Sequence, residues 1–384
     1  MRITGYRTLT TRQDWGRSVG DSNGVFMSGV LDIALLLVDT DEGITGVGMG
    51  SHVETEKVFA AIEGEDPRST TALYDRMVRN AFKAGHAGSI GGTIGAFDSA
   101  LWDIKAKAAG EPLWRLLGGR DRTVTAYGSA LDIALSDDEL VAAYSAYAAR
   151  GVKAGKLKGG LDVERDKVRL GLIRDVIADA SPTNVRPGLM LDANECWTRK
   201  QAVRHVAELE RDFDLIWVEE PVRRWDAEGM VAVGRGIRAS VASGENLSGL
   251  DQFRPLLAAG AIDIVQTASV WGLTHFLRVA AFAHAHDLPV SPVGTTPMPL
   301  LHAATAIPNH IASELQDLTP PLGVKVDMVI QDGCFVLGDS PGLGITLDEA
   351  AIAAIERPPA VGRPTGTQIR PEFAGRRLNQ GAPR

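Results

Sequence analysis

Short apolar runs that end in charged or polar residues recur through the middle of the chain. Residues 187–191 and 215–218 are the clearest runs, and helix-like segments at residues 199–211 and 227–238 follow them. A short apolar run that ends in charge is typical of a buried strand whose end reaches a solvent-accessible face. Strand, charged end and helix in alternation predict an α/β fold with a parallel barrel, where chemistry lies at the carboxyl ends of the strands.

Eight segments from residue 123 onward fit the strands of such a barrel. They are residues 123–130, 152–158, 189–192, 215–219, 240–244, 262–266, 289–292 and 311–315. Eight strands match the number in a (β/α)8 barrel.

The first part of the chain, residues 1–119, has a different pattern. Two apolar runs within residues 30–48, separated by turn residues, predict a β-hairpin. Apolar residues at helical spacing predict a helix over residues 94–108. Residues 15–25 are polar and contain glycine, which predicts a mobile loop. The pattern therefore predicts an α+β domain ahead of the barrel.

Composition and charge narrow the class of protein. The 384 residues are 45% hydrophobic, which is ample for one large domain and a smaller one. A net charge of −8, mixed along the chain, argues against nucleic acid as a partner. Cys196 and Cys334 give no disulfide framework, so we expect a cytoplasmic location. No leader and no apolar run of membrane-spanning length are seen, so no membrane association is expected.

Three carboxylates follow three of the predicted strands. Asp192, Glu219 and Glu245 are separated by 27 and 26 residues, about one βα unit each. Adjacent barrel strands would bring their oxygens together. Three carboxylates without histidine or cysteine suit a hard cation, and Mg²⁺ is the default.

Two lysines end the strand before these carboxylates. Lys156 and Lys158 are two residues apart, so their side chains point to the same side of the strand. Two ammonium groups held close disfavour each other's protonation, and a lysine of lowered pKa is a usable general base. A divalent cation beside such a lysine suits removal of the proton next to the carboxylate of a small molecule, with the metal stabilising the enediolate.

Four motifs in this order resemble the enolase superfamily, in its mandelate racemase and muconate lactonizing enzyme branch. The motifs are Lys156-Leu157-Lys158, Asp192-Ala193-Asn194, Glu219-Glu220-Pro221 and Gly244-Glu245-Asn246. The resemblance implies a modified TIM barrel, (β/α)7–8, over residues 120–322. It also implies an α+β capping domain over residues 1–119, completed by a C-terminal segment, residues 323–384, that returns to the cap. A homo-oligomer is expected on the same ground.

The resemblance also implies roles for individual residues. Asp192, Glu219 and Glu245 would be the Mg²⁺ ligands, Lys158 the base and Lys156 the residue that tunes it. Glu314 resembles the acid that hydrogen-bonds the substrate carboxylate. Other substrate contacts would come from Trp15, Arg17 and Asp21 in a lid over the barrel mouth, from Asn194 and from His302. Glu220 and Asn246, like Asn194, would lie beside the metal ligands. His302 also fits a packed helix residue, and His275 is a weaker candidate for the site.

One departure from the family pattern bears on mechanism. The family's second acid–base pair, an Asp on the sixth strand and a His on the seventh, falls here at Ala268 and Val293, and Trp271 would fill part of the vacated volume. Without a base on the far face, Lys158 alone would abstract the α-proton and assist loss of a β-hydroxyl, giving a 2-keto-3-deoxy acid from an acid sugar. The alternatives are a racemase, epimerase or cycloisomerase with an unrecognised second base, and a metal- and ligand-binding homologue that has lost turnover.

Overall fold

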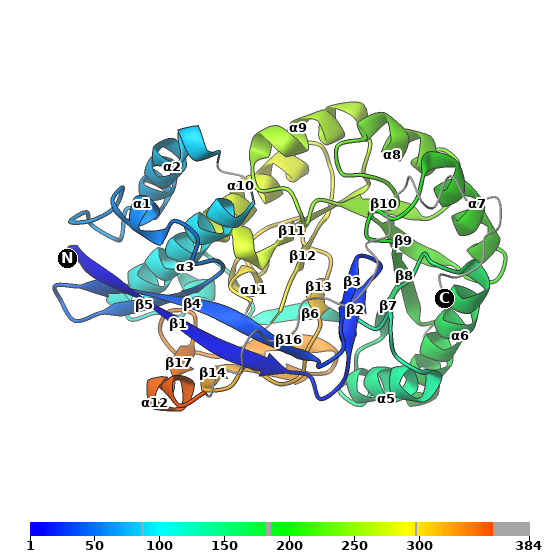
Figure 1. The fold of residues 1–384 in the computed structure, drawn as a ribbon, viewed down its shortest axis with the longest axis horizontal. Helices are drawn as coiled ribbons and strands as arrows, with labels where there is room; N and C mark the ends of the chain where they lie inside the picture. The colour runs from blue at the N-terminus through cyan, green and yellow to red at the C-terminus, as the bar shows by residue number, and fades with distance from the viewer. Residues whose placement is uncertain (86–87, 182–185, 296–297, 356–384) are drawn as a thin grey trace.

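A parallel barrel forms the centre of the molecule in the computed structural model, which describes residues 1–85, 88–181, 186–295 and 298–355 (Figure 1). Its strands are β6 (Thr123–Gly128), β7 (Ala154–Lys158), β8 (Gly188–Asp192), β9 (Leu215–Glu219), β10 (Ser240–Ser243), β11 (Ile264–Ala268), β12 (Val290–Val293) and β13 (Ser313–Leu315). Consecutive strands from β6 to β12 are hydrogen-bonded neighbours, and β13 pairs with β6. Each lies at or within a few residues of its predicted position.

The ring between β12 and β13 is joined by a single bridge rather than a ladder. This bridge pairs Val290 with His310. The Val290 N–H donates to the Asn309 carbonyl at 2.8 Å, and the Val290 carbonyl accepts the Ile311 N–H at 3.1 Å. A helix follows each strand from β6 to β12: α5 (Asp137–Ala148), α6 (Val163–Ala180), α7 (Arg199–Leu209), α8 (Ala227–Gly234), α9 (Leu250–Ala259), α10 (Leu273–His284) and α11 (Leu300–Ala304). Within the described ranges no helix comes directly after β13, so the modified TIM barrel is confirmed in its seven-helix form.

Local sequence explains where these helices begin. Ser136 and Glu139 form a capping box at the start of α5, and the side chains of Asp162 and Asp226 accept backbone N–H groups at the starts of α6 and α8. Such caps satisfy donors that the first helical turn leaves without partners. Inside the barrel, a small apolar cluster forms the floor beneath the charged strand ends: Tyr127, Met190, Trp217, Ala242 and Ile264.

The N-terminal domain packs a three-stranded antiparallel sheet against helices. The sheet contains β1 (Ile3–Asp14), β4 (Val30–Thr40) and β5 (Thr45–Met49), and the helices are α1 (Thr55–Phe59), α2 (Thr70–Asn80), η1 (Phe82–Ala84), α3 (Ser89–Ala109) and α4 (Leu113–Leu116). The predicted hairpin and helix are both present. Gly48 permits the close approach of α3 to β5, because a Cβ there would lie 1.9 Å from the Ala96 carbonyl oxygen.

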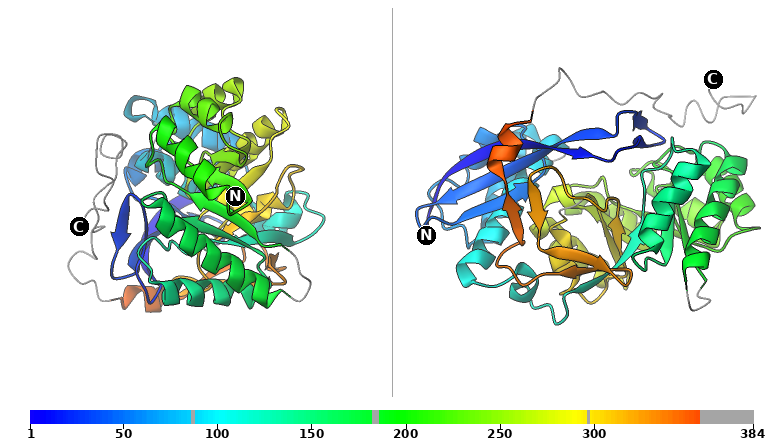
Figure 2. Two further views of the ribbon diagram at one scale, coloured as in Figure 1. Left: turned by 90° about the vertical axis from the view of Figure 1, so that its right-hand side faces the viewer. Right: turned by 90° about the horizontal axis from the view of Figure 1, so that it is seen from below.

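The segment at residues 15–25, predicted as a mobile loop, contains two short strands. β2 (Val19–Asp21) and β3 (Gly24–Phe26) pair as a short hairpin. The hairpin projects from the end of the cap sheet over the barrel, where the Gly20 N–H donates to the Leu131 carbonyl at 2.8 Å (Figure 2). Backbone pairing and a contact with a barrel loop therefore define a hairpin that composition alone did not indicate.

The C-terminal segment touches both parts of the molecule. It contains β14 (Val324–Val326), β15 (Met328–Gln331), β16 (Cys334–Leu337), β17 (Ile345–Leu347) and α12 (Glu349–Ala353). β16 pairs antiparallel with β6, whereas Glu349 accepts a 2.7 Å hydrogen bond from Arg7 of the cap sheet. The rest of the predicted C-terminal segment, residues 356–384, lies outside the described residues. Among those that are described, no helix is long and apolar enough to span a bilayer.

Candidate active site

The carboxyl ends of four barrel strands bring together a buried charged cluster. Lys156 Nζ lies 2.8 Å from both Glu219 carboxylate oxygens, 3.0 Å from Glu314 Oε1 and 3.5 Å from Asp192 Oδ2. Lys158 Nζ forms an ion pair with Asp192. All five side chains are buried. The parallel register explains the meeting, because Lys158 is the direct neighbour of Asp192, and Asp192 of Glu219.

The surrounding carboxylates keep both lysines protonated in this side-chain arrangement. The prediction that the pKa of each lysine is lowered is therefore wrong for this arrangement. Burial alone lowers the pKa of Lys156, but the carboxylates of Glu219 and Glu314 outweigh it and raise the pKa well above its ordinary value. Burial likewise lowers the pKa of Lys158, and Asp192 raises it further than Lys156 lowers it. Each ammonium faces carboxylates within ion-pair distance, and their attraction exceeds the repulsion between the lysines.

The three predicted metal ligands lie at or just beyond the ends of three adjacent strands. Glu219 faces into the barrel, accepting hydrogen bonds from Gln266 Nε2 at 2.7 Å and Trp217 Nε1 at 3.2 Å. Glu245 lies two residues beyond β10 and is partly buried. In this side-chain arrangement no three His, Cys, Asp or Glu groups of the described residues are gathered closely enough to share an ion.

The charge of these groups nevertheless fits a divalent cation. Burial, followed by the nearby Asp192, raises the pKa of Glu219 to about 8, and burial also raises the pKa of Glu245. Glu220 is buried beside them, and burial and Glu245 raise its pKa well above the ordinary value. Carboxylates crowded in a buried site destabilise one another unless a cation offsets their charge, and oxygen donors suit Mg²⁺.

Glu314 is tied to the lysine side of the cluster. It accepts hydrogen bonds from the Gly294 N–H at 3.1 Å and from Gln316 Nε2 at 2.8 Å, besides its ion pair with Lys156. Burial raises its pKa, but Lys156 and Lys158 lower it by more, so the net shift is downward. An ionised Glu314 therefore holds the Lys156 ammonium in place.

Strained backbone marks the loops that follow β8 and β9. Asn194, Glu195 and Glu220 have φ values of 44°, 64° and 42°, in the left-handed region that residues with a side chain seldom adopt. The Glu195 N–H donates to the Glu220 carbonyl at 2.7 Å and joins the two loops. Such strain persists where surrounding contacts fix the backbone, and it concentrates at functional sites.

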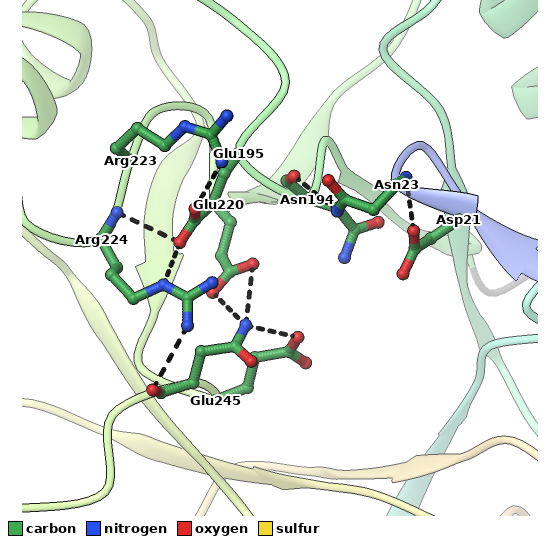
Figure 3. A pocket seen from close by; sticks show the side chains of 9 residues that line it. Asp21, Asn23, Asn194, Glu195, Glu220, Arg223, Arg224 and Glu245 are labelled. Carbon is green, nitrogen blue, oxygen red and sulfur yellow. Dashed lines mark hydrogen bonds and ion pairs between the residues drawn. The ribbon is translucent and has the colours of Figure 1, made fainter. Parts of the chain in front are cut away.

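A polar cavity of about 220 Å³ opens beside the charged cluster (Figure 3). Its lining residues are Asp21, Asn23, Asn194, Glu195, Glu220, Arg223, Arg224, Glu245 and Asn246. Asn246 Nδ2 donates to Glu220 Oε1 at 3.1 Å and to Glu245 Oε1 at 3.0 Å, as its predicted place beside the ligands requires. The buried Asn194 Oδ1 has no hydrogen-bond partner among the described residues.

The hairpin brings only part of the predicted lid to this cavity. Asp21 lines it and accepts a 2.6 Å hydrogen bond from the Asn23 N–H. Trp15 and Arg17 do not line it. The Trp15 N–H donates to the Gly29 carbonyl at 3.0 Å, and the Arg17 guanidinium donates to the Ser18 carbonyl at 3.2 Å.

Five residues of the barrel mouth were not identified from the sequence. Ser22 Oγ donates to the Ala193 carbonyl at 3.0 Å, and Asn23 Nδ2 donates to the Asn194 carbonyl at 3.1 Å, which dock the hairpin on the loop after β8. The other three are Glu195, Arg223 and Arg224. Only their position in the sequence indicated a place near the site: Glu195 directly follows the Asp-Ala-Asn motif, and the arginines come two and three residues after Glu-Glu-Pro.

The side of the mouth formed by β11 and β12 is apolar at the strand ends. Ala268 and Val293 end these strands and are register partners. Trp271 Nε1 donates to the Glu245 carbonyl at 2.6 Å, so this indole contacts the loop of a predicted metal ligand. The absence of a second base remains a prediction from the family pattern.

Neither histidine candidate joins the cluster. His302 is buried in α11 and lines a small apolar space with Met298, Val326 and Leu343, where burial lowers its pKa to about 4. The His275 ring lies 5.9 Å from the ring of Phe253, which belongs to α9 in the outer layer of helices. The structure thus places His302 as a packed helix residue.

Comparison with known proteins agrees with this architecture. Residues 139–351 match the family described as enolase C-terminal domain-like, and residues 28–118 match the mandelate racemase / muconate lactonizing enzyme N-terminal domain. The chain is 29% identical to 3,6-anhydro-alpha-L-galactonate cycloisomerase of Streptomyces coelicolor, over 86% of this chain and 93% of that protein. It is also 29% identical to L-talarate/galactarate dehydratase of Salmonella typhimurium, over 83% of this chain and 82% of that one.

The fold is also similar to that of a solved structure. The L-talarate dehydratase of Polaromonas sp. JS666, complexed with Mg and L-glucarate, aligns with a TM-score of 0.79 and 29% identity, over 92% of this chain and 96% of that one. The matched ranges include the barrel from α5 onward and the cap from residue 28 to residue 118. The chain therefore belongs to the enolase superfamily, in its mandelate racemase and muconate lactonizing enzyme branch.

Proposed function

We propose that this protein is a Mg²⁺-dependent enzyme that removes the proton alpha to the carboxylate of an acid sugar and dehydrates the sugar to a 2-keto-3-deoxy acid. The observation that carries the proposal is the buried pair Lys156 and Lys158 among carboxylates at the carboxyl ends of the barrel strands. Relatives named as acid-sugar dehydratases support the same chemistry.

Asp192, Glu219 and Glu245 are the residues that would hold the cation, with Asn194, Glu220 and Asn246 around them. For Glu219 this requires its carboxylate to turn away from Lys156. When bound, Mg²⁺ supplies positive charge that stabilises negative charge developing on the substrate carboxylate and offsets the carboxylates that face Lys158.

Lys158 carries the proton in this proposal. Its neutral amine takes the α-proton from C2 of the sugar acid, giving an enediolate and an ammonium. The ammonium then gives that proton to the hydroxyl on C3 as the C3–O bond breaks, so water leaves and the amine is regenerated. The enol that remains is protonated at C3 and loses the proton of its C2 hydroxyl, which gives the 2-keto-3-deoxy acid. Proton transfer by a positioned group of this kind contributes about 10²- to 10⁴-fold to the rate.

Lys156 and Glu314 have a supporting part. The Lys156 ammonium, fixed by Glu314 at 3.0 Å, presents positive charge on the same side of β7 as Lys158. We propose that the Lys156 ammonium binds the substrate carboxylate. It would also disfavour protonation of Lys158 when bound Mg²⁺ offsets the charge of the carboxylates that face Lys158. Assembly into a homo-oligomer, a cytoplasmic location and the division into residues 1–119, 120–322 and 323–384 belong to the same proposal and rest on the resemblance and the composition.

A second candidate is an isomerase, supported by the similarity to a cycloisomerase over 86% of this chain. A racemase or epimerase would need an acid on the far face of the enediolate, where Ala268 and Val293 end the strands. That apolar pair favours dehydration by one base. The third alternative, a homologue that binds metal and ligand without turnover, is disfavoured by the retained lysine pair.

The test is a panel of mono- and dicarboxylic sugar acids incubated with Mg²⁺ in deuterated buffer. Formation of 2-keto acid and incorporation of deuterium at the α-carbon are followed together. Keto acid from one sugar is the expected result. Deuterium incorporation without keto acid would favour the isomerase, and neither signal from any sugar acid would contradict both catalytic proposals.

A further inference from the structure

We propose that Arg223 and Arg224 form a subsite for a second carboxylate, so that the preferred substrate is a dicarboxylic sugar acid. The inference rests on the proposed function, because it assigns the far end of the same substrate. It concerns the polar cavity beside the charged cluster, whose wall on one side consists of the loop after β9 (Figure 3).

The two arginines share one buried carboxylate. Arg223 Nη1 lies 3.1 Å from Glu195 Oε2, and Arg224 forms an ion pair with Glu195 Oε1 through Nε. Glu195 is 2% exposed, whereas the side chains of Arg223 and Arg224 are 22% and 32% exposed. One carboxylate neutralises one guanidinium, so Glu195, Arg223 and Arg224 together carry one positive charge, in a cavity that Asp21, Glu220 and Glu245 also line.

The arginines also keep hydrogen-bonding capacity. A guanidinium has five N–H donors in a planar fork, which matches both oxygens of a carboxylate. Among the described residues, Arg224 donates from Nε to Glu195 and from Nη1 to the Asn246 carbonyl at 3.4 Å, and Arg223 donates from Nη1 alone. Donors on both side chains therefore remain for a ligand in the cavity.

The anchor beneath the arginines is rigid. Glu195 has a φ of 64°, its N–H is bonded to the Glu220 carbonyl at 2.7 Å, and its carboxylate also accepts the Arg224 N–H at 3.2 Å. The Arg223 guanidinium lies 5.8 Å from the ring centroid of Trp225. A subsite whose side chains are fixed before binding loses less conformational entropy when a ligand arrives.

The same cavity is lined by the two arginines and by residues next to the proposed metal site. Its lining includes Glu245 and Asn194, which adjoin the proposed metal site, and Figure 3 shows the arginines on the side away from Asp21 and Asn23. A substrate whose first carboxylate lies beside Lys158 would extend its far end into this cavity. A terminal carboxylate would offer two charged oxygens to the remaining N–H donors of the two guanidiniums, whereas a terminal hydroxymethyl group would offer one neutral oxygen.

The test compares a six-carbon sugar diacid with the aldonic acid of the same configuration, for the wild type, Arg223→Gln and Arg224→Lys. Arg223→Gln leaves Arg224 on the buried Glu195, and Arg224→Lys keeps a cation there while removing the planar fork. Arg235→Gln, at the exposed end of α8, is the matched control. Thermal unfolding of each variant verifies that it folds.

The expected result is a wild-type preference for the diacid in kcat/KM, and a fall in the diacid-to-monoacid ratio of about 10- to 100-fold in Arg223→Gln, as expected for lost charged hydrogen bonds. Arg235→Gln should keep the wild-type ratio. A wild type that prefers the monoacid, or an unchanged ratio in Arg223→Gln, would overturn the subsite while leaving the dehydratase proposal intact.

Binding separates the two proposals if no sugar acid is turned over. The rise in Tm on adding the diacid with Mg²⁺ is then measured for the same proteins. A rise in the wild type that shrinks at least by half in Arg223→Gln would support the subsite even though the dehydratase proposal fails. An equal rise in both proteins, or none in either, would overturn the subsite as well.

Discussion

Asp132 is expected to be one of the most destabilising positions to truncate near the active site. Its buried carboxylate accepts the Lys158 N–H at 3.0 Å and the Tyr144 hydroxyl at 2.9 Å. The Arg169 guanidinium, only 3% exposed, lies 3.5 Å from Asp132 Oδ1 and also donates to the Asp132 carbonyl at 2.5 Å. Asp132 thus connects the proposed base to the helix layer without touching a substrate.

The magnitude follows from what Asp132→Ala leaves behind. The Arg169 cation would stay buried without its ion-pair partner, and breaking a buried pair in this way costs about 3–5 kcal/mol. The Tyr144 hydroxyl keeps its 2.6 Å bond to the Lys156 carbonyl, so the loss of its bond to Asp132 adds little to the cost. We expect the free energy of unfolding to fall by about 3–5 kcal/mol, with Arg169 as the main cause.

A double-mutant cycle measured by urea unfolding tests this reasoning. Asp132→Ala, Arg169→Met and the double variant are compared, and because the double variant carries neither charge, its loss should be about 1–3 kcal/mol smaller than the sum of the single losses. Asp138→Ala, on the exposed face at the start of α5, is the control and should cost less than about 1 kcal/mol. A loss below about 1 kcal/mol in Asp132→Ala, or additive losses, would refute the account.

Three further predictions concern the hairpin, the metal and His302. Ser22→Val removes the 3.0 Å bond that docks the hairpin and should lower kcat/KM about 5- to 30-fold, with faster proteolysis of the hairpin; an unchanged proteolysis rate would count against docking. Mg²⁺ at about 100 times its Kd should stabilise the wild type by about 2.7 kcal/mol in thermal unfolding, and chelation should reverse this, whereas Glu245→Gln should show a smaller effect. Burial lowers the pKa of His302 from 6.5 to about 4, so between these pH values the folded state binds fewer protons than the unfolded chain, and stability falls as the pH drops through this window. His302→Gln should remove up to about 3 kcal/mol of this loss and leave kcat unchanged.

The barrel and the identity of its charged strand ends could be predicted because both depend on local pattern. β9 runs over the residues that the sequence indicated, 215–219, since an apolar run between polar neighbours defines a buried strand. The spacing of Asp192 and Glu219 placed them on adjacent strands, and their register pairing confirms it. Strand ends in a parallel barrel necessarily meet at one face.

The properties that depend on contacts between strands and loops could not be predicted. The pKa of Lys158 follows from Asp192 across the strand pair, which outweighs the neighbouring Lys156. The pairing of Arg223 and Arg224 with Glu195 depends on left-handed backbone in two loops, and no residue type there announces it. The position of His302 beneath the C-terminal strands likewise needs the tertiary fold.

The most direct test of the central claim is exchange of the substrate α-proton with deuterated solvent in Lys158→Gln. The wild type and Lys153→Gln, an exposed lysine just before the same strand, serve as references, each saturated with Mg²⁺ and a sugar acid that the wild type converts. We expect wild-type exchange in Lys153→Gln and a loss of about 10²- to 10⁴-fold in Lys158→Gln, whose cooperative thermal unfolding above the assay temperature verifies that it is folded. Exchange within tenfold of the wild type in Lys158→Gln would contradict its role as the base.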